Sequence, residues 1–276
     1  MQVFINDRFV PDNEACLSLD DAGFVWGATV VERLRTFGGK TFRLDDHLRR
    51  FRQSCDGAMI PQRLTDARLR EVINEAITRN LHEAEELAIV LLATPGIAGV
   101  PTLIIRATQF EYARYAPVIR DGAHLVTVPA TPGVDPTIKH RSRLAWWIAR
   151  QQVGTGRDPL FIGPAGFVRE TAAANFIAVI DNRLVCPPLS EVLNGIALRA
   201  LSEAGPPIAE QELTIAEVLA GASECLLCCS SYGVAPVAMI NGMTIGTGDR
   251  PRCGELQAIY GRLAGIDILR QFQTNR

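Results

Sequence analysis

The stretch Thr137-Ile-Lys-His-Arg-Ser-Arg-Leu-Ala-Trp-Trp147 is the part of this chain around which the rest is best interpreted, because it holds one of only two lysines. The other 26 of the 28 basic residues are arginines. A lysine in such a chain is either an ordinary surface residue or an amine that must be able to lose its proton, which arginine cannot do. Lys139 follows a turn-rich run and precedes an amphipathic stretch, so it is expected at an element boundary. Lys40, in Gly38-Gly-Lys-Thr41, is predicted to be a solvated lysine at a hairpin tip.

Length and composition favour a globular enzyme of small-molecule chemistry. The chain has 276 residues, of which 47% are hydrophobic, enough for one large or two medium domains. A net charge of −2 does not favour binding to nucleic acid or to an anionic membrane, which usually requires a basic surface. No apolar run reaches transmembrane length, and the first residues lack the basic segment followed by an apolar segment that is typical of a signal peptide. We therefore expect a cytoplasmic protein without a membrane or nucleic-acid partner.

Cysteine and histidine usage gives no metal site. The seven cysteines are an odd number, and Cys225-x-x-Cys228 is followed by neither a second pair nor a histidine cluster. These cysteines are predicted to be buried small hydrophobic residues of a strand. The four histidines are dispersed along the chain at no familiar ligand spacing.

Strand hairpins interspersed with helices predict an α+β (mixed α/β) architecture in two domains. Residues 112–122 are the best candidate linker, which divides the chain into a smaller N-terminal α/β domain, 1–117, and a larger C-terminal domain, 118–276, carrying Lys139. The Gly/Pro-rich segment 94–101 is expected to be a loop between two apolar strands.

A lysine that forms a Schiff base with an aldehyde cofactor needs an anion-binding site, a carboxylate for the pyridine nitrogen and a dry pocket. Arg50 could bind a phosphate, although a solvated helix face explains it too. The helix start at 194–197 offers backbone N–H groups, although many such starts bind nothing. Ser230 could donate a hydroxyl or simply form a turn. Glu170 precedes a run of small residues that would let a planar ring approach.

In this order the segments resemble the class IV aminotransferases, the fold-type IV group of pyridoxal-phosphate enzymes that includes D-amino-acid and branched-chain transaminases and aminodeoxychorismate lyase. The resemblance covers nearly the whole chain. It rests on His47-Leu-Arg-Arg50 with Ser54, Ile138-Lys-His140 with Arg143-Leu144, Glu170 with Asn175, Asn194-Gly-Ile196 with Arg199, Gly233-Val-Ala-Pro-Val237, Asn241-Gly242 and Gly246.

The resemblance implies a role for each matching position. Lys139 would form the Schiff base with pyridoxal 5′-phosphate and move the proton at the substrate Cα. Glu170 would pair with the pyridine nitrogen. Arg50, the backbone of Ile196 and Ala197, and Ser230 would hold the phosphate. A homodimer with a two-domain fold-type IV architecture is also implied.

Departures from the family pattern concern the substrate. Leu144 stands where branched-chain transaminases usually carry a tyrosine, and the strand at 91–96 lacks the arginine that often binds a substrate carboxylate. Arg33, Arg35 and Arg106 are candidates to replace it, each equally well explained as a surface or supporting residue. The leading hypothesis is a transaminase acting on an amino acid and a 2-oxo acid. The alternatives are an aminodeoxychorismate lyase releasing pyruvate and 4-aminobenzoate, and a non-catalytic binding protein.

Overall fold

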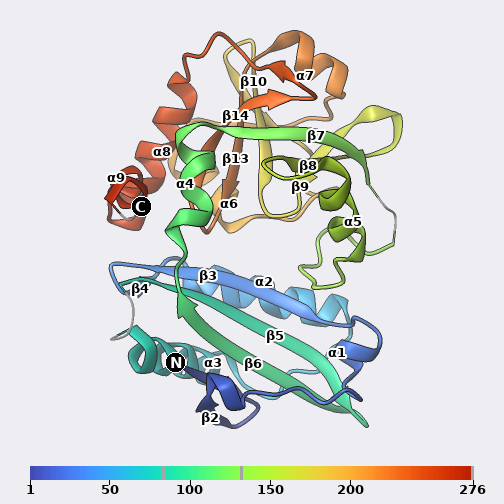
Figure 1. Ribbon diagram of the computed structural model, residues 1–276, viewed down its shortest axis with the longest axis vertical. Helices are drawn as coiled ribbons and strands as arrows, with labels where there is room; N and C mark the ends of the chain where they lie inside the picture. Colours follow the sequence, from blue (N-terminus) through green and yellow to red (C-terminus); the bar gives the residue numbers. More distant parts are fainter. Residues whose placement is uncertain (82–84, 131–132, 275–276) are drawn as a thin grey trace. The chain divides into compact units, whose positions relative to one another are not determined.

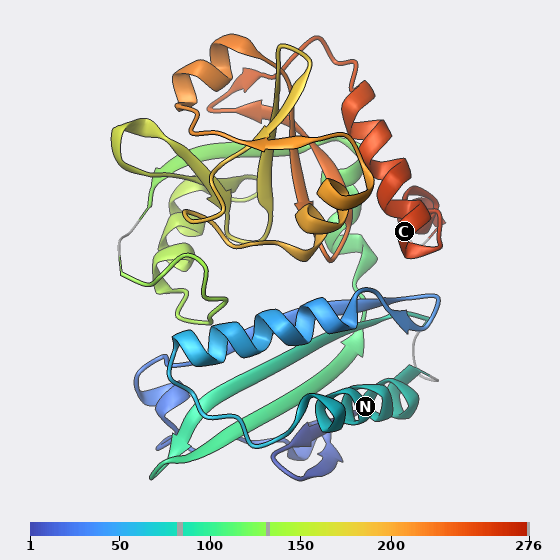
Figure 2. The same ribbon diagram turned by 180° about the vertical axis from the view of Figure 1, so that it is seen from behind.

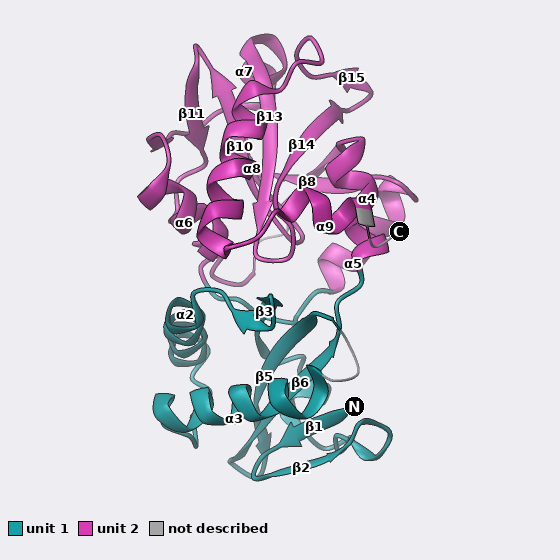
Figure 3. Cartoon of the chain, turned by 90° about the vertical axis from the view of Figure 1, so that its left-hand side faces the viewer, with its two compact units in different colours: residues 1–111, 138–143 teal, residues 112–137, 144–276 magenta. Residues whose placement is uncertain are grey.

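A computed structural model describes residues 1–81, 85–130 and 133–274 and divides the chain into two compact units (Figures 1 and 3). Unit 1 contains Met1–Glu111 and Ile138–Arg143. Unit 2 contains Tyr112–Thr137 and Leu144–Arg276. Each unit has its own β-sheet covered by helices, which confirms the predicted mixture of helices and strands.

Unit 1 is built on an antiparallel sheet with the strand order β2-β1-β6-β5-β3-β4 among the described residues. Its strands are β1 (Gln2–Ile5), β2 (Arg8–Pro11), β3 (Val30–Phe37), β4 (Lys40–Thr41), β5 (Leu87–Ile97) and β6 (Val100–Gln109). Its helical elements are η1 (Asp12–Glu14), α1 (Ala22–Val25), α2 (Leu44–Gly57) and α3 (Asp66–Asn80).

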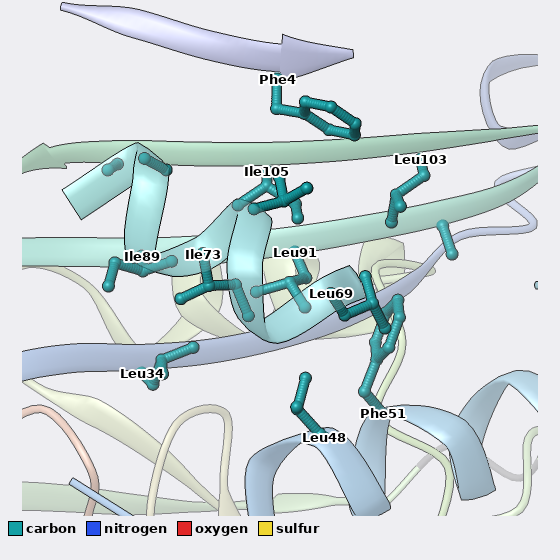
Figure 4. Close-up of a cluster of buried hydrophobic side chains, with 14 of the residues drawn as sticks. Phe4, Leu34, Leu48, Phe51, Leu69, Ile73, Ile89, Leu91, Leu103 and Ile105 are labelled. Carbon is teal, nitrogen blue, oxygen red and sulfur yellow. The ribbon is translucent and has the colours of Figure 1, made fainter. Parts of the chain in front are cut away.

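Helices α2 and α3 cover one face of this sheet, as Figure 2 shows. Helix α3 begins where the Thr65 side chain accepts a hydrogen bond from the backbone N–H of Arg68, an N-cap that satisfies one of the helix's unpaired donors. Its apolar residues recur every three or four positions, so they form one stripe facing the sheet. The core between helices and sheet includes Phe4, Leu34, Leu48, Phe51, Leu69, Ile73, Ile89, Leu91, Leu103 and Ile105 (Figure 4).

Unit 2 contains a mixed sheet with the order β12-β11-β10-β13-β14-β7-β8-β9 in its described part, and β15 pairs with β14. Strand pairs β11–β12, β7–β14 and β7–β8 are parallel, and the others are antiparallel. Its strands are β7 (Ala123–Pro129), β8 (Asp158–Ile162), β9 (Val168–Thr171), β10 (Asn175–Ile180), β11 (Arg183–Cys186), β12 (Ile208–Glu210), β13 (Ala222–Cys229), β14 (Gly233–Ile240) and β15 (Met243–Thr244).

Helices of unit 2 pack on the strands of its sheet: α6 and α8 contact β13, α4 and α8 contact β14, and α5 contacts β8. The N-terminus of α8 is held by a side chain from the sheet, because the buried carboxylate of Glu224 accepts hydrogen bonds from the backbone N–H groups of Arg252 and Cys253. The helical elements are α4 (Tyr112–Arg120), α5 (Leu144–Val153), η3 (Pro164–Gly166), α6 (Ile196–Ala204), α7 (Ile215–Gly221), α8 (Pro251–Ala264) and α9 (Ile268–Thr274).

The structure differs from the sequence-based expectations in three places. The expected linker at 112–122 is mostly helix α4, with Pro117 inside it, so unit 2 begins at Tyr112 rather than after Pro117. The expected loop at 94–101 is the end of a long β5–β6 hairpin. The segment Ile138–Arg143, with Lys139, belongs to unit 1 and not to the unit formed by the C-terminal residues.

Two absences hold for the described residues. None of their helices has the length and apolar character needed to cross a membrane. They also contain no group of three or more histidine, cysteine, aspartate or glutamate side chains placed to bind a metal ion.

Candidate active site

The backbone of Lys139 is fixed to strand β3 and helix α2 of unit 1. Its carbonyl accepts a hydrogen bond from the backbone N–H of Val31 at 2.9 Å. Its own N–H donates to the Ser54 hydroxyl oxygen at 3.1 Å. The next residue, His140, forms an isolated antiparallel bridge with Val30. These bonds explain why a segment that lies between two parts of unit 2 in the sequence packs with unit 1.

Arg50 lies on α2 and is 6% exposed. Its Nε donates to Glu32 Oε2 at 2.9 Å and its Nη2 to Glu32 Oε1 at 2.6 Å, a two-bond pairing of guanidinium with carboxylate. His47 Nδ1 lies 3.0 Å from the same Oε1, and Glu32 is fully buried. Arg50 and Ser54 are four residues apart on α2 and so share one helix face. One face of the helix thus carries both the partner of Glu32 and the hydroxyl that binds the backbone of Lys139.

The charges around this cluster are strongly coupled. Burial by itself raises the pKa of Glu32, but the Arg50 charge and the His47 and Arg50 hydrogen bonds outweigh it and hold that pKa well below its usual range. Burial lowers the pKa of His47, assisted by the charges of Arg50 and Lys139 and opposed by Glu32. The lowered pKa of His47 favours its neutral imidazole, which contacts Glu32 through Nδ1.

A second imidazole, His140, has its pKa lowered by burial and by the charges of Arg143 and Lys139. The neutral form is thus favoured for both histidines, and the charge of Lys139 contributes to the lowered pKa of each. The positive charge on this side of unit 1 comes from lysine and arginine, which are the side chains suited to a phosphate or carboxylate.

In unit 2, Glu170 stands on β9 and both of its oxygens accept hydrogen bonds. Asn175 Nδ2 donates to Oε2 at 3.0 Å, and the backbone N–H of Leu193 donates to Oε1 at 3.2 Å. The same Nδ2 also donates to the carbonyl of Leu193 at 2.7 Å. The carboxylate is therefore held by β10 and by the loop that leads into α6.

Helix α6 begins at Ile196, and its N-cap residue Gly195 supplies no side-chain hydrogen bond to the first turn. Ile196 and Ala197 are each 1% exposed, so their backbone N–H groups lie at a buried helix start, where the helix dipole favours an anion. Ser230 follows β13 in the turn to β14, half-buried. Strand β13 pairs with β10, with Cys228 opposite Asn175, so the turn and the Glu170 network share one sheet.

These residue types fit a phosphorylated pyridine aldehyde. An amine and a buried arginine are present in unit 1, and a fixed carboxylate and a helix start without a side-chain cap are present in unit 2. The chain matches the family "Amino-transferase class IV" over residues 29–240, which is well over half of its length.

The chain belongs to the class IV aminotransferases. Membership confirms the predicted enzyme class and pyridoxal phosphate as its cofactor. It also confirms that the chemistry is amino-group transfer between an amino acid and a 2-oxo acid. The non-catalytic alternative gains no support, and neither does the lyase, because the relatives described next carry aminotransferase names.

Among curated proteins, the D-alanine aminotransferase of Staphylococcus haemolyticus is 28% identical over 261 residues, which are 90% of this chain and 92% of that one. A putative branched-chain-amino-acid aminotransferase of Methanocaldococcus jannaschii is 27% identical over 262 residues, 89% of this chain and 90% of that one.

Solved structures of class IV aminotransferases share the fold. The branched-chain amino acid aminotransferase of Escherichia coli superposes with a TM-score of 0.86 at 22% identity, covering 96% of this chain and 95% of that one. A hypothetical aminotransferase from Mycobacterium tuberculosis in its PLP-bound form gives 0.84 at 22% identity, covering 98% and 100%.

The predicted site residues fall into two sets, Lys139 and Arg50 in unit 1 and Glu170, Ile196, Ala197 and Ser230 in unit 2, and their roles remain predictions. Sequence reasoning missed Glu32 as the partner of Arg50. The available signal was a lone carboxylate in the apolar strand stretch Val30–Leu34, a position that requires a buried partner.

The three arginines considered for a substrate carboxylate have different environments. Arg35 is 2% exposed, with its guanidinium over the rings of Phe37 and Phe110. Arg106 forms a two-bond pair with Asp12 at the surface. Arg33 is half-buried on β3. Packing and ion pairing therefore account for Arg35 and Arg106 without a substrate.

The buried Glu32–Arg50 pair predicts how stability depends on pH. Glu32→Gln leaves the Arg50 charge buried without its counter-charge, which should lower the free energy of unfolding at pH 7 by about 3–5 kcal/mol. The folded-state pKa of Glu32 lies below the unfolded one, so its contribution is complete above the unfolded value of roughly 4.3 and is lost as the pH falls below it. Urea unfolding should show that the difference in free energy of unfolding between wild type and Glu32→Gln becomes smaller as the pH falls below about 5.

Asp12→Asn is the matched control, because it removes a carboxylate with the same two-bond arginine pairing at an exposed position. This variant should lower the free energy of unfolding by only about 0–1 kcal/mol. Equal costs for the two variants, or a gap that does not depend on pH, would contradict this description of Glu32.

Proposed function

We propose that Lys139 is the catalytic lysine of this aminotransferase and that it moves the proton at the substrate Cα. The observation that carries this proposal is the fixing of Lys139 by Val31 and Ser54, on the strand and helix that also carry Glu32 and Arg50. A catalytic amine needs such a rigid support, because small misplacements of a reacting group cost large factors in rate.

The other residues of the site have binding roles in this proposal. Glu170 pairs with the pyridine nitrogen of the cofactor. The Arg50 guanidinium, the backbone N–H groups of Ile196 and Ala197, and the Ser230 hydroxyl bind the phosphate. Bound pyridoxal phosphate supplies the electron sink that the breaking bond at Cα requires. The lysine amine then removes the proton from one carbon and delivers it to another, as a general base and acid.

The amino donor is the finer part of the proposal. D-alanine aminotransferases and a branched-chain-amino-acid aminotransferase are similar to the chain to nearly the same degree. Leu144, which stands where branched-chain enzymes usually have a tyrosine, favours the first group. We therefore propose a small D-amino acid, with D-alanine as the compound to test first, and a 2-oxo acid as acceptor.

The proposed reaction is tested by incubating the holoenzyme with 2-oxoglutarate and D-alanine, L-alanine or L-leucine in separate reactions. Pyruvate and glutamate formed from D-alanine alone would support the D-specific proposal. Turnover of L-leucine in its place would overturn the donor but not the enzyme class. A reaction with aminodeoxychorismate, yielding 4-aminobenzoate without any 2-oxo acid, would overturn the transaminase proposal.

We further propose that the chain acts in the cytoplasm. None of its cysteines is joined in a disulfide in the structure, as expected of a protein kept in a reducing compartment.

We propose a homodimer in which the apolar surface of unit 1 around α1 is covered. Phe24 is 64% exposed and Trp26 is 80% exposed, neighbours in a stretch that also exposes Leu19 and Val25. Adjacent exposed aromatic side chains of this kind mark association surfaces. Light scattering should give twice the chain mass for wild type and a lower mass for the double variant Phe24→Ser, Trp26→Ser. Met59→Ser, at an isolated residue that is 87% exposed, should leave the mass unchanged.

Replacement of the two lysines separates the catalytic residue from its control. Lys139→Ala should lower kcat by about 10²–10⁴-fold, because it removes the general base and acid. Lys40→Ala removes an exposed amine at the β3–β4 turn and should leave kcat within about twofold. Steady-state rates with the best donor decide the matter, and a Lys139→Ala enzyme with wild-type turnover would contradict the assignment.

A further inference from the structure

One buried amide, that of Asn175, links the two parts of the unit 2 site. Asn175 opens strand β10 and is 5% exposed. Its Nδ2 donates to Glu170 Oε2 at 3.0 Å and to the carbonyl oxygen of Leu193 at 2.7 Å. Because both partners are acceptors, only the NH₂ end of the amide can face them. Its Oδ1 must therefore point elsewhere.

That oxygen lies against Gly195. A Cβ added to Gly195 would stand 1.9 Å from Asn175 Oδ1, which is far shorter than any non-bonded contact allows. Gly195 has φ −70° and ψ 136°, an extended conformation that every residue adopts easily. Glycine is therefore required here by the close approach of the amide and not by the backbone conformation.

The contacts form a continuous path from the carboxylate to the helix. Leu193 donates its N–H to Glu170 Oε1 at 3.2 Å and accepts from Asn175 with its carbonyl. Gly195 comes two residues later, directly before α6 begins at Ile196. The Asn175 amide thus contacts both the Glu170 carboxylate and the residue before α6, and its position affects the positions of both.

We propose that Asn175 is a positioning residue that fixes the separation between the Glu170 carboxylate and the N-terminus of α6. The inference rests on the proposed function, in which these two groups hold opposite ends of the cofactor, the pyridine nitrogen and the phosphate. A rigid cofactor is bound tightly only if the two protein groups that hold its opposite ends stay at the separation that fits its length.

The coupling between Asn175 and Gly195 is to be followed in the affinity for the cofactor, which a buried asparagine that serves stability alone would not change. In the wild-type background, the Cβ introduced by Gly195→Ala must displace the Asn175 amide, which breaks its bonds to Glu170 and Leu193. In an Asn175→Ala background, the atom that causes the clash is absent. Gly195→Ala should then have little further effect, so the two substitutions should be strongly non-additive.

The measurement is the dissociation constant of the apoprotein for pyridoxal phosphate, followed by absorbance or fluorescence titration, together with the thermal midpoint of each apoprotein. Asn175→Ala and Gly195→Ala should each weaken binding by about tenfold or more, the order of loss that follows removal of a partner that orients a metal ligand, which is about 10–100-fold. The double variant should bind about as weakly as either single variant.

Asn175→Asp gives a second readout that a purely structural role would not produce. It keeps the shape of the side chain but replaces the donor with a carboxylate beside Glu170. The two carboxylates repel, so one of them binds a proton as the pH falls, which restores a donor at this position. The affinity of Asn175→Asp for pyridoxal phosphate should therefore recover at lower pH relative to wild type, whereas that of Asn175→Ala should not.

Asn80→Ala is the matched control. Asn80 is a fully buried asparagine of unit 1 whose Nδ2 donates to the carbonyls of Gln2 and Ala76 and whose Oδ1 accepts from the backbone N–H of Gln2. Its replacement should lower the thermal midpoint without weakening cofactor binding.

Failure of this inference is distinguishable from failure of the proposed function. A wild-type apoprotein that does not bind pyridoxal phosphate contradicts the proposed function itself. Normal wild-type binding together with unchanged affinity in Asn175→Ala overturns only the positioning role. An equal, additive effect of Gly195→Ala in both backgrounds also overturns it.

Discussion

The buried pairing of Glu32 with Arg50 is the interaction on which the site in unit 1 depends. A carboxylate that is fully excluded from water is tolerated only if its charge is matched and its oxygens are hydrogen-bonded, and Arg50 and His47 meet both conditions. The pair joins β3 to α2. The strand and helix that this ion pair joins therefore also hold the backbone of Lys139, through Val31 and Ser54.

In unit 2, neutral groups donate hydrogen bonds to the carboxylate of Glu170. Glu170 accepts hydrogen bonds from the Asn175 amide and from the backbone N–H of Leu193, which orient its two oxygens. In the function that we propose, this oriented carboxylate pairs with the ring nitrogen of the cofactor. The two glutamates thus differ in these contacts: Glu32 pairs with a buried arginine, whereas the donors from Asn175 and Leu193 to Glu170 are neutral.

The sequence predicted those elements whose signals are local. Apolar periodicity was enough to predict the mixture of strand hairpins and helices, and the rarity of lysine was enough to single out Lys139. The end of the β5–β6 hairpin, residues 94–101, was expected to be a loop because it is rich in glycine and proline, and α4 was mistaken for a linker because Pro117 is unusual inside a helix. Local sequence patterns do not predict this hairpin end and this helix, because both depend on tertiary packing.

The partnerships within the site were beyond the sequence for the same reason. Glu32 and Arg50 are 18 residues apart, and Leu193 and Asn175 are also 18 apart, so only the folded chain brings each pair together. The glycine at 195 was read as part of a helix start, whereas its close approach to the Asn175 amide depends on how β10 meets the loop before α6. Residue types could be predicted from a pattern, but their contacts required the fold.

The central claim is that Lys139 is the amine that binds the cofactor. Its most direct test is reduction of the holoenzyme with borohydride, which makes the bond between the cofactor and an amine permanent, followed by protease digestion and mass spectrometry. The sequence contains two lysines, Lys40 and Lys139, which protease digestion places on different peptides. The account predicts that the phosphopyridoxyl group is found on the peptide containing Lys139. Its recovery on the peptide containing Lys40, or on no peptide of a catalytically active preparation, would contradict the account.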